Sequence, residues 1–286
     1  LSKLSFIKTG TARLVHFKTH SSQISNFLSK PTRLLAESGV EDSDVILLAA
    51  GEHFFRYANG ENSESLFWRS LPALAAREAG KQCILLPSTL GPFEDLPSRN
   101  LPVSLLNLTQ VNAVREARSK SLVEAYTDSS RIPVCLDPAF FVKRPALKRR
   151  KSGITALVLR SEGWGIRLSK ESRRKFSEKF QGDAYNSTKS FQTALELAQK
   201  TLVDPKNRIH LFIQTVADQE LAMALVKALA DDGLEDRVEV SRPNSVDEYL
   251  EQLSIVDRVI ASRFHAIILG LVVRKPVYGL FFDVHG

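Results

Sequence analysis

The sequence has 286 residues; 43% are hydrophobic and 25% are charged, as is typical of a globular protein long enough for two domains. No apolar run approaches the roughly 20 residues that cross a bilayer, and Leu1–Phe6 show no secretory signal pattern, so we expect a cytoplasmic protein. The two cysteines, Cys83 and Cys135, lie in apolar runs and are expected to be buried free thiols, as in a reducing compartment.

Apolar runs rich in β-branched residues alternate with helical patterns along the first half of the chain. This alternation is typical of a parallel sheet covered by helices. Gly80 is expected to end the first of these helices. The expected strands span residues 44–50, 82–87, 112–115 and 132–136, and the expected helices span residues 63–80 and 119–126.

The net charge of +7, from 39 basic and 32 acidic residues, includes a dense basic run, Lys143–Lys151, with six cations and no acid. The run contains no aromatic residue, which argues against a nucleic-acid partner, and it stands between two folded patterns. We expect a solvated linker between domains there. The alternative is a contact with an anionic membrane surface, which would place the protein peripherally at the inner face of the membrane.

The same rhythm restarts after the basic run. The expected strands span residues 154–160, 208–214, 238–240, 257–261 and 276–281, and the expected helices span residues 188–202, 218–231, 246–253 and 264–273. The predicted fold class is therefore α/β, with two Rossmann-like domains facing a cleft, residues 1–145 and residues 146–286.

Near its end the sequence interrupts an apolar run with Ser262-Arg263-Phe264-His265. These residues are expected at the carboxyl end of a buried strand and at the start of a helix, where open α/β sheets bind ligands and where anions are favoured. The fixed cation of Arg263 and the titratable imidazole of His265 indicate a small anionic substrate and proton transfer. The alternative is that both side chains only satisfy neighbouring groups.

Arg160 ends the first expected strand of the second half. Burying the charge of an arginine there without a partner would reduce the free energy of unfolding. Arg160 therefore either pairs with an acid such as Glu162 or Asp137, or binds an anion.

Polar residues and glycines also follow the strands of the first half. Gly51 and Glu52 follow the first strand, and Gly91 begins a Gly-Pro turn after the second; ordinary turns explain these residues as well as a ligand contact does. Arg115 either lines the cleft or pairs with the acid next to it. Asp137 precedes a proline, which is the pattern of a helix N-cap.

Taken in order, these segments resemble the polysaccharide pyruvyl transferase family. The block Arg263-Phe264-His265 stands where the family has Arg-Leu-His and is the most specific part, followed by Leu136–Phe140. The sequence departs from the family at Ala50-Gly51, where paired glycines are usual. The matching segments are residues 44–51, 84–93, 114–119, 136–140 and 259–266, which extend over most of the chain.

The resemblance implies a GT-B-like fold and transfer of the enolpyruvyl group of phosphoenolpyruvate to a sugar diol of a polysaccharide or its lipid-linked precursor, giving a pyruvate ketal. The second domain would bind phosphoenolpyruvate through Arg160, Arg263 and Phe264. His265 would be the general acid/base, and Asp137 would orient a partner or activate a hydroxyl. The first domain would bind the acceptor, and its residues on the cleft would be Gly51, Glu52, Gly91 and Arg115.

No metal-ligand spacing, Walker A loop or Gly-x-Gly-x-x-Gly motif occurs in the sequence. We expect no cofactor or metal, because arginines supply the positive charge that phosphoenolpyruvate requires. Two other functions remain open on the residues. A GT-B nucleotide-sugar glycosyltransferase would need a nucleotide-binding acid, for which Glu248 and Glu251 are candidates. A non-catalytic homologue would keep Arg263 and His265 for structural reasons alone.

Overall fold

The structure, a computed structural model, describes residues 40–48, 51, 63–91, 104, 106–111, 113–126, 132–146, 152–160, 189–215 and 218–280. Its contacts divide the chain into two compact units, Ser2–Pro138 and Ala139–Gly286. The division precedes residue 145, where the sequence analysis placed the boundary, because Phe140 and Val142 pack against the core of the second unit. The start of the basic run therefore belongs to the second unit.

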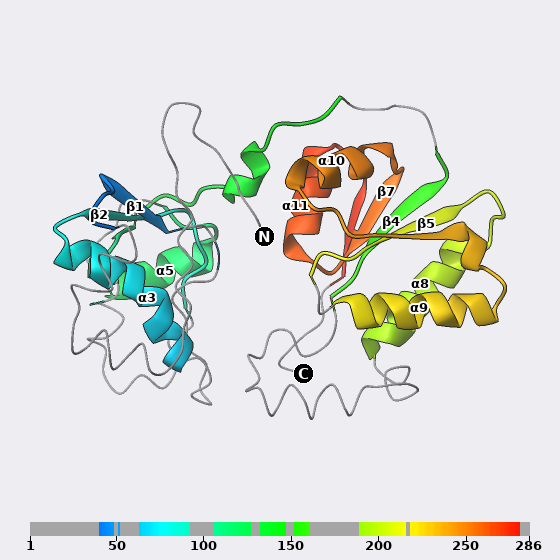
Figure 1. The fold of residues 1–286 in the computed structure, drawn as a ribbon, viewed down its shortest axis with the longest axis horizontal. Helices are drawn as coiled ribbons and strands as arrows, with labels where there is room; N and C mark the ends of the chain where they lie inside the picture. Colours follow the sequence, from blue (N-terminus) through cyan, green and yellow to red (C-terminus); the bar gives the residue numbers. More distant parts are fainter. Residues whose placement is uncertain are drawn as a thin grey trace. The chain divides into compact units, whose positions relative to one another are not determined.

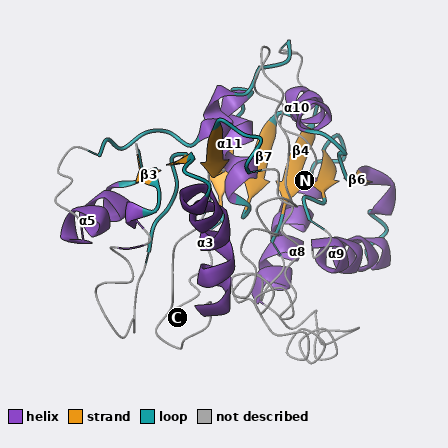
Figure 2. Ribbon diagram, turned by 60° about the vertical axis from the view of Figure 1, so that its left-hand side comes forward, coloured by secondary structure: helices purple, strands orange, loops and turns teal. Residues whose placement is uncertain are grey.

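The first unit contains a three-stranded parallel sheet in the order β1-β2-β3. Its elements are β1 (Val45–Leu48), α3 (Ser63–Glu78), β2 (Gln82–Leu85), β3 (Gln110–Val111) and α5 (Ala117–Tyr126). Figure 2 shows α3, β3 and α5 with their labels. Apolar side chains from strands and helices form one core, which includes Leu48, Ala76, Leu85 and Val123. Both expected helices and the first two expected strands are confirmed to within a few residues.

Helix α3 ends at the predicted glycine. Gly80 has φ +65°; its N–H donates to the Arg77 carbonyl at 3.0 Å, and the Lys81 N–H donates to the Ala76 carbonyl at 2.7 Å. These two bonds form a Schellman motif, whose left-handed residue is usually glycine because glycine has no Cβ. The helix continues through Pro72, which lacks an N–H to donate within it.

The two later strands expected in the first half are wrong in extent. Val114 forms single parallel bridges to Ser88 and Val134, and β3 lies earlier in the chain. Pro133 explains part of the difference, since it has no N–H for a ladder and contributes only its carbonyl, which accepts from the Val114 N–H at 3.1 Å. The run 132–136 is therefore an extended segment with a single bridge in place of a strand.

The two cysteines differ in exposure, which corrects the expectation that both are buried. Cys83 lies on β2 within the core, whereas Cys135 lies on the extended segment after Val134 and is exposed. Burial raises the pKa of the Cys83 thiol to about 11.

A thiol-alkylating reagent at mildly alkaline pH is expected to modify Cys135 and to leave Cys83 intact in the folded protein. The thiolate is the reactive form, and burial both shields Cys83 and keeps it protonated. Peptide mass mapping after timed labelling measures the two rates, with urea-unfolded protein as the control in which both cysteines react. Faster labelling of Cys83 than of Cys135 in the folded protein would contradict this arrangement.

The second unit contains a five-stranded parallel sheet in the order β6-β5-β4-β7-β8. Its elements are β4 (Ile154–Val158), α8 (Lys189–Leu202), β5 (Arg208–Phe212), α9 (Gln219–Asp231), β6 (Val238–Ser241), α10 (Val246–Ile255), β7 (Arg258–Ala261), α11 (Phe264–Val272) and β8 (Val277–Gly279). Every strand and helix expected after the basic run is confirmed to within a few residues. The order, with the first strand at the centre, is that of a Rossmann-like sheet.

Helices cover both faces of this second sheet (Figure 1). Helices α8 and α9 pack on one face against Leu157 and Leu211, while α10 and α11 pack on the other against Ala156 and Val259. Strand β4 has four consecutive buried residues because it is central and covered on both sides. The strand order reverses direction between β4 and β7, so the carboxyl ends of these two strands form the edge where such a sheet binds ligands.

Candidate functional site

The carboxyl ends of β4 and β7 bring two predicted site segments together. Val158 and Ala261 are partners in the parallel register. Beyond them, the Ser262 N–H donates to the Val158 carbonyl at 2.9 Å, and the Arg160 N–H donates to the Ser262 hydroxyl at 2.7 Å. The backbone of Arg160 therefore lies beside the segment that carries Arg263 and begins α11.

The Arg263 side chain reaches from the end of β7 to the residues that follow β5. Its Nε donates to Asp218 Oδ2 at 3.0 Å, its Nη2 donates to the Thr215 hydroxyl at 3.0 Å, and Nη2 also pairs with Asp218 Oδ1. Because β4 lies between β5 and β7, this side chain crosses the carboxyl end of the central strand. The Arg263 and Asp218 side chains are only 12% and 2% exposed, so the carboxylate compensates a cation that is largely withdrawn from water.

Phe264 and His265 occupy the first turn of α11 and are both exposed. Their rings meet edge to face, with centroids 5.7 Å apart and planes at 72°. The backbone N–H groups of a first helical turn lack partners within the helix and favour an anion. The second unit thus presents an arginine on each of two strand ends and an accessible imidazole at a helix start, a combination suited to binding an anion and transferring a proton.

Four of the five predicted site positions in the first unit lie among the described residues: Gly51, Gly91, Arg115 and Asp137. Three of these four, Gly51, Arg115 and Asp137, belong to one hydrogen-bonded network. Arg115 Nη1 contacts Asp137 Oδ2 at 2.7 Å, with side chains 9% and 3% exposed. Arg115 Nε donates to the Thr89 hydroxyl at 3.1 Å, and the Thr89 N–H donates to the Gly51 carbonyl at 3.0 Å. Asp137, which the sequence offered as a partner for Arg160, is therefore an ion-pair partner of Arg115.

Glu116 and Ser119 extend this network toward α5. The Thr89 hydroxyl donates to Glu116 Oε2 at 3.0 Å. The Ser119 hydroxyl donates to the other carboxylate oxygen, Glu116 Oε1, and accepts from the Leu90 N–H at 2.8 Å. Gly91, with φ +73°, packs under Leu122, whose Cδ1 would lie 2.2 Å from an added Cβ. The left-handed φ of Gly91 favours glycine at this turn, whereas the end of the Leu122 side chain could move aside for a Cβ.

Glu52 lies outside the described residues. Thr89, Thr215 and the contact of Asp218 with Arg263 were not predicted from the sequence. Asp218 was assigned only to the start of a helix. In both places a threonine follows the end of a strand. Only Thr215 has its acid close by in the sequence, three residues away, whereas Arg115 is 26 residues from Thr89 and no local pattern links the two.

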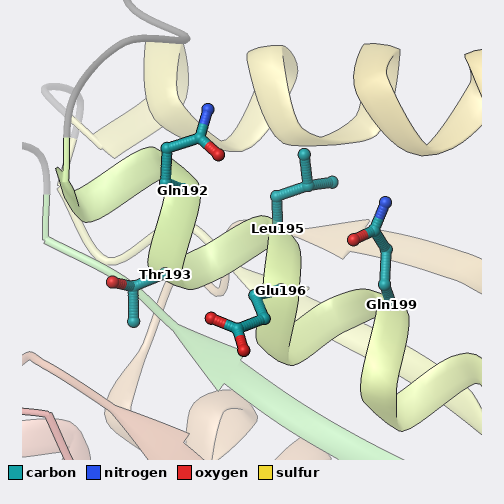
Figure 3. A pocket seen from close by; sticks show the side chains of 5 residues that line it. All are labelled: Gln192, Thr193, Leu195, Glu196 and Gln199. Carbon is teal, nitrogen blue, oxygen red and sulfur yellow. The ribbon is translucent and has the colours of Figure 1, made fainter.

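A hollow of about 440 Å³ lies elsewhere, along α8 (Figure 3). Its lining side chains all come from that one helix, with Gln192, Leu195 and Gln199 on one side and Thr193 and Glu196 on the other. Ligand sites usually combine polar groups from several elements, and the exposed Glu196 already pairs with Lys200 at 2.5 Å. Within the described part of the chain there is no cluster of three metal-ligating side chains, and no helix is long and apolar enough to cross a membrane.

Several solved structures resemble this fold, among them the following two. One is a protein described as a UDP-N-acetylglucosamine 2-epimerase from Listeria monocytogenes, with a TM-score of 0.51, 13% identity, and coverage of 90% of this chain and 61% of that chain. The other is UDP-GlcNAc 2-epimerase from Neisseria meningitidis bound to UDP-GlcNAc, with a TM-score of 0.52, 13% identity, and coverage of 93% of this chain and 66% of that chain. The chain thus spans less than two thirds of the length of either structure.

Both structures have the GT-B fold, so the GT-B-like α/β class expected from the sequence is confirmed. At 13% identity the likeness concerns the fold alone. No curated protein sequence matches the chain significantly. The family model for polysaccharide pyruvyl transferases matches residues 6–280, nearly the whole chain, and the protein therefore belongs to the polysaccharide pyruvyl transferase family.

Proposed function

We propose that the protein is a transferase that moves the enolpyruvyl group of phosphoenolpyruvate onto a sugar diol of a polysaccharide or its lipid-linked precursor. The products are a cyclic pyruvate ketal and phosphate. Family membership supports a pyruvyl transferase. The grouping of Arg160, Arg263 and His265 at the carboxyl ends of β4 and β7 carries the donor assignment.

Phosphoenolpyruvate is a compact polyanion, so its site needs fixed cations and oriented N–H donors. In this proposal Arg160 and Arg263 hold its phosphate and carboxylate, since the planar guanidinium matches both groups. The first turn of α11 adds backbone N–H donors. Phe264, 52% exposed in the same turn, offers an apolar surface to the methylene group.

His265 is assigned the proton transfer. It donates a proton to the methylene carbon of phosphoenolpyruvate, which leaves the adjacent carbon electron-poor, and a sugar hydroxyl attacks that carbon and returns its proton to the imidazole. The bond to the phosphate oxygen then breaks, and the second sugar hydroxyl attacks the same carbon to close the ketal. The proton of that second hydroxyl leaves with phosphate, so the reaction balances without an oxidant or a metal ion.

The acceptor is assigned to the carboxyl edge of the first sheet, where Gly51, Thr89 and Arg115 lie together. Asp137 is proposed to orient Arg115, because their 2.7 Å ion pair is buried. Glu52, which follows Gly51 in the sequence, is proposed as a further acceptor contact.

A nucleotide-sugar glycosyltransferase is the competing proposal, and Glu248, one of its two candidate acids, has another role. Glu248 accepts from the Asn244 N–H at 2.8 Å, while its own N–H donates to the Ser245 hydroxyl at 3.1 Å. This reciprocal arrangement at the start of α10 resembles a capping box and accounts for Glu248 without a nucleotide.

Phosphoenolpyruvate is expected to stabilise the folded protein selectively. A ligand that binds only the folded state adds about 2.7 kcal/mol of unfolding free energy at a hundred times its Kd. A thermal-shift series compares phosphoenolpyruvate with phosphate, pyruvate and a panel of nucleoside diphosphates. The shift should disappear in Arg263→Ala and persist in Arg208→Ala. Arg208 is exposed and begins β5, so it lies at the amino ends of the strands, away from the proposed site. A response to a nucleoside diphosphate alone would favour the glycosyltransferase, and no response would favour a non-catalytic protein.

A further inference from the structure

Asp218 directly precedes α9, where an aspartate ordinarily caps the helix, yet its side chain makes no capping hydrogen bond. Its backbone is already helical, with φ −80° and ψ −11°, whereas a capping residue is usually extended. Its Oδ2 accepts instead from the N–H and the hydroxyl of Thr215, at 3.1 Å and 2.9 Å. Both carboxylate oxygens of Asp218 also contact the Arg263 guanidinium. The residue therefore forgoes a stabilising cap and holds an arginine.

The three side chains close a ring of hydrogen bonds. The Thr215 hydroxyl donates to Asp218 and accepts from Arg263 Nη2, while Arg263 Nε and Nη2 both reach Asp218. A two-point contact fixes the plane of a guanidinium as well as its position. The ring thus sets the orientation of the arginine that crosses the carboxyl end of β4.

The surroundings of the ring shield it from water. Tyr249 of α10 stacks at an angle on Phe212, with ring centroids 5.1 Å apart, and its hydroxyl is buried with no hydrogen-bond partner. Burial and the negative charge of Asp218 raise the pKa of Tyr249, as expected for a phenol beside a carboxylate in a dry environment. Water therefore has little access to compete for the Asp218 carboxylate, whose side chain is 2% exposed.

We propose that Asp218, supported by Thr215, is a positioning residue that holds the Arg263 guanidinium in the orientation required to bind phosphoenolpyruvate. This role rests on the proposed function, since it assumes that Arg263 contacts the donor. Two effects of removing the carboxylate have opposite signs. Loss of orientation weakens anion binding, whereas loss of the compensating negative charge on its own would strengthen it. The sign of the change therefore identifies which effect governs the site.

The first test is calorimetric titration of phosphoenolpyruvate into Asp218→Asn. Its Kd is expected to rise roughly tenfold to a hundredfold, as for a small misplacement of a binding group. Thr215→Val removes one hydroxyl without changing the charge or size of the site. It should raise Kd in the same direction by a smaller factor, and it provides the answer if Asp218→Asn does not fold. Asp231→Asn is the matched control, because Asp231 is an exposed aspartate at the last position of α9. This variant should bind phosphoenolpyruvate with the Kd of the unaltered protein.

The second test is coupling to Arg263. If Asp218 acts through Arg263, the Asp218→Asn change should have little further effect in an Arg263→Lys background, because the bidentate contact is already lost. Tighter binding in Asp218→Asn, an unchanged Kd in both Asp218→Asn and Thr215→Val, or fully additive effects would overturn the positioning role. Failure of the unaltered protein to bind phosphoenolpyruvate would overturn the proposed function instead, and this inference with it.

Discussion

Replacing His265 by asparagine is expected to lower kcat for ketal formation roughly 10²-fold to 10⁴-fold, the range for loss of a general acid/base. Asparagine keeps a polar side chain of similar reach but does not titrate near neutral pH. The side chain of His265 is exposed in the first turn of α11, so the change should leave folding stability nearly unaltered. Binding of phosphoenolpyruvate should also persist, because Arg160, Arg263 and the helix N-terminus supply the positive potential.

Phosphate release measures this effect, with saccharide acceptors that differ in the spacing and orientation of their hydroxyl pairs. In deuterated water the product methyl group should carry one solvent deuterium, which reports protonation of the methylene carbon. Lys227→Ala, an exposed change on α9, is the control. A His265→Asn protein that turns over at the unaltered rate would remove this residue from the mechanism. One that no longer binds phosphoenolpyruvate would assign it to binding.

The second sheet was predictable because its strands and helices are marked locally. Buried parallel strands appear in the sequence as short apolar runs, and β4 has four successive buried residues. The start of α10 is marked by Ser245 and Glu248, whose spacing is that of a capping box. Local sequence patterns also predicted that Arg263 and His265 lie between the end of a strand and the start of a helix, and the structure has them there.

Contacts between distant segments were not predictable from local patterns. Arg263 and Asp218 are 45 residues apart, and they meet only because β5 and β7 flank β4 in the sheet. A pattern of apolar runs predicts strands but does not specify their order. The exposure of Cys135 was missed for a related reason, since an apolar run predicts a buried strand unless a residue such as Pro133 prevents the ladder.

Breaking the Arg115–Asp137 pair is expected to destabilise the first unit strongly. Both side chains are buried, at 9% and 3% exposure, so Asp137→Ala leaves a guanidinium withdrawn from water without its counter-ion. Removal of one partner of a buried pair typically costs about 3–5 kcal/mol of unfolding free energy. Urea unfolding followed by circular dichroism, with calorimetry to separate the transitions of the two units, measures the loss.

Two further variants distinguish burial from charge as the cause. Glu124→Ala breaks the exposed Lys120–Glu124 pair on α5 of the same unit and should cost less than about 1 kcal/mol, because water screens that pair. Combining Asp137→Leu with Arg115→Met removes both charges and should recover much of the stability lost in Asp137→Ala. If Asp137→Ala is no more destabilising than Glu124→Ala, the carboxylate does not hold Arg115, and its proposed role in orienting that arginine for the acceptor fails with it.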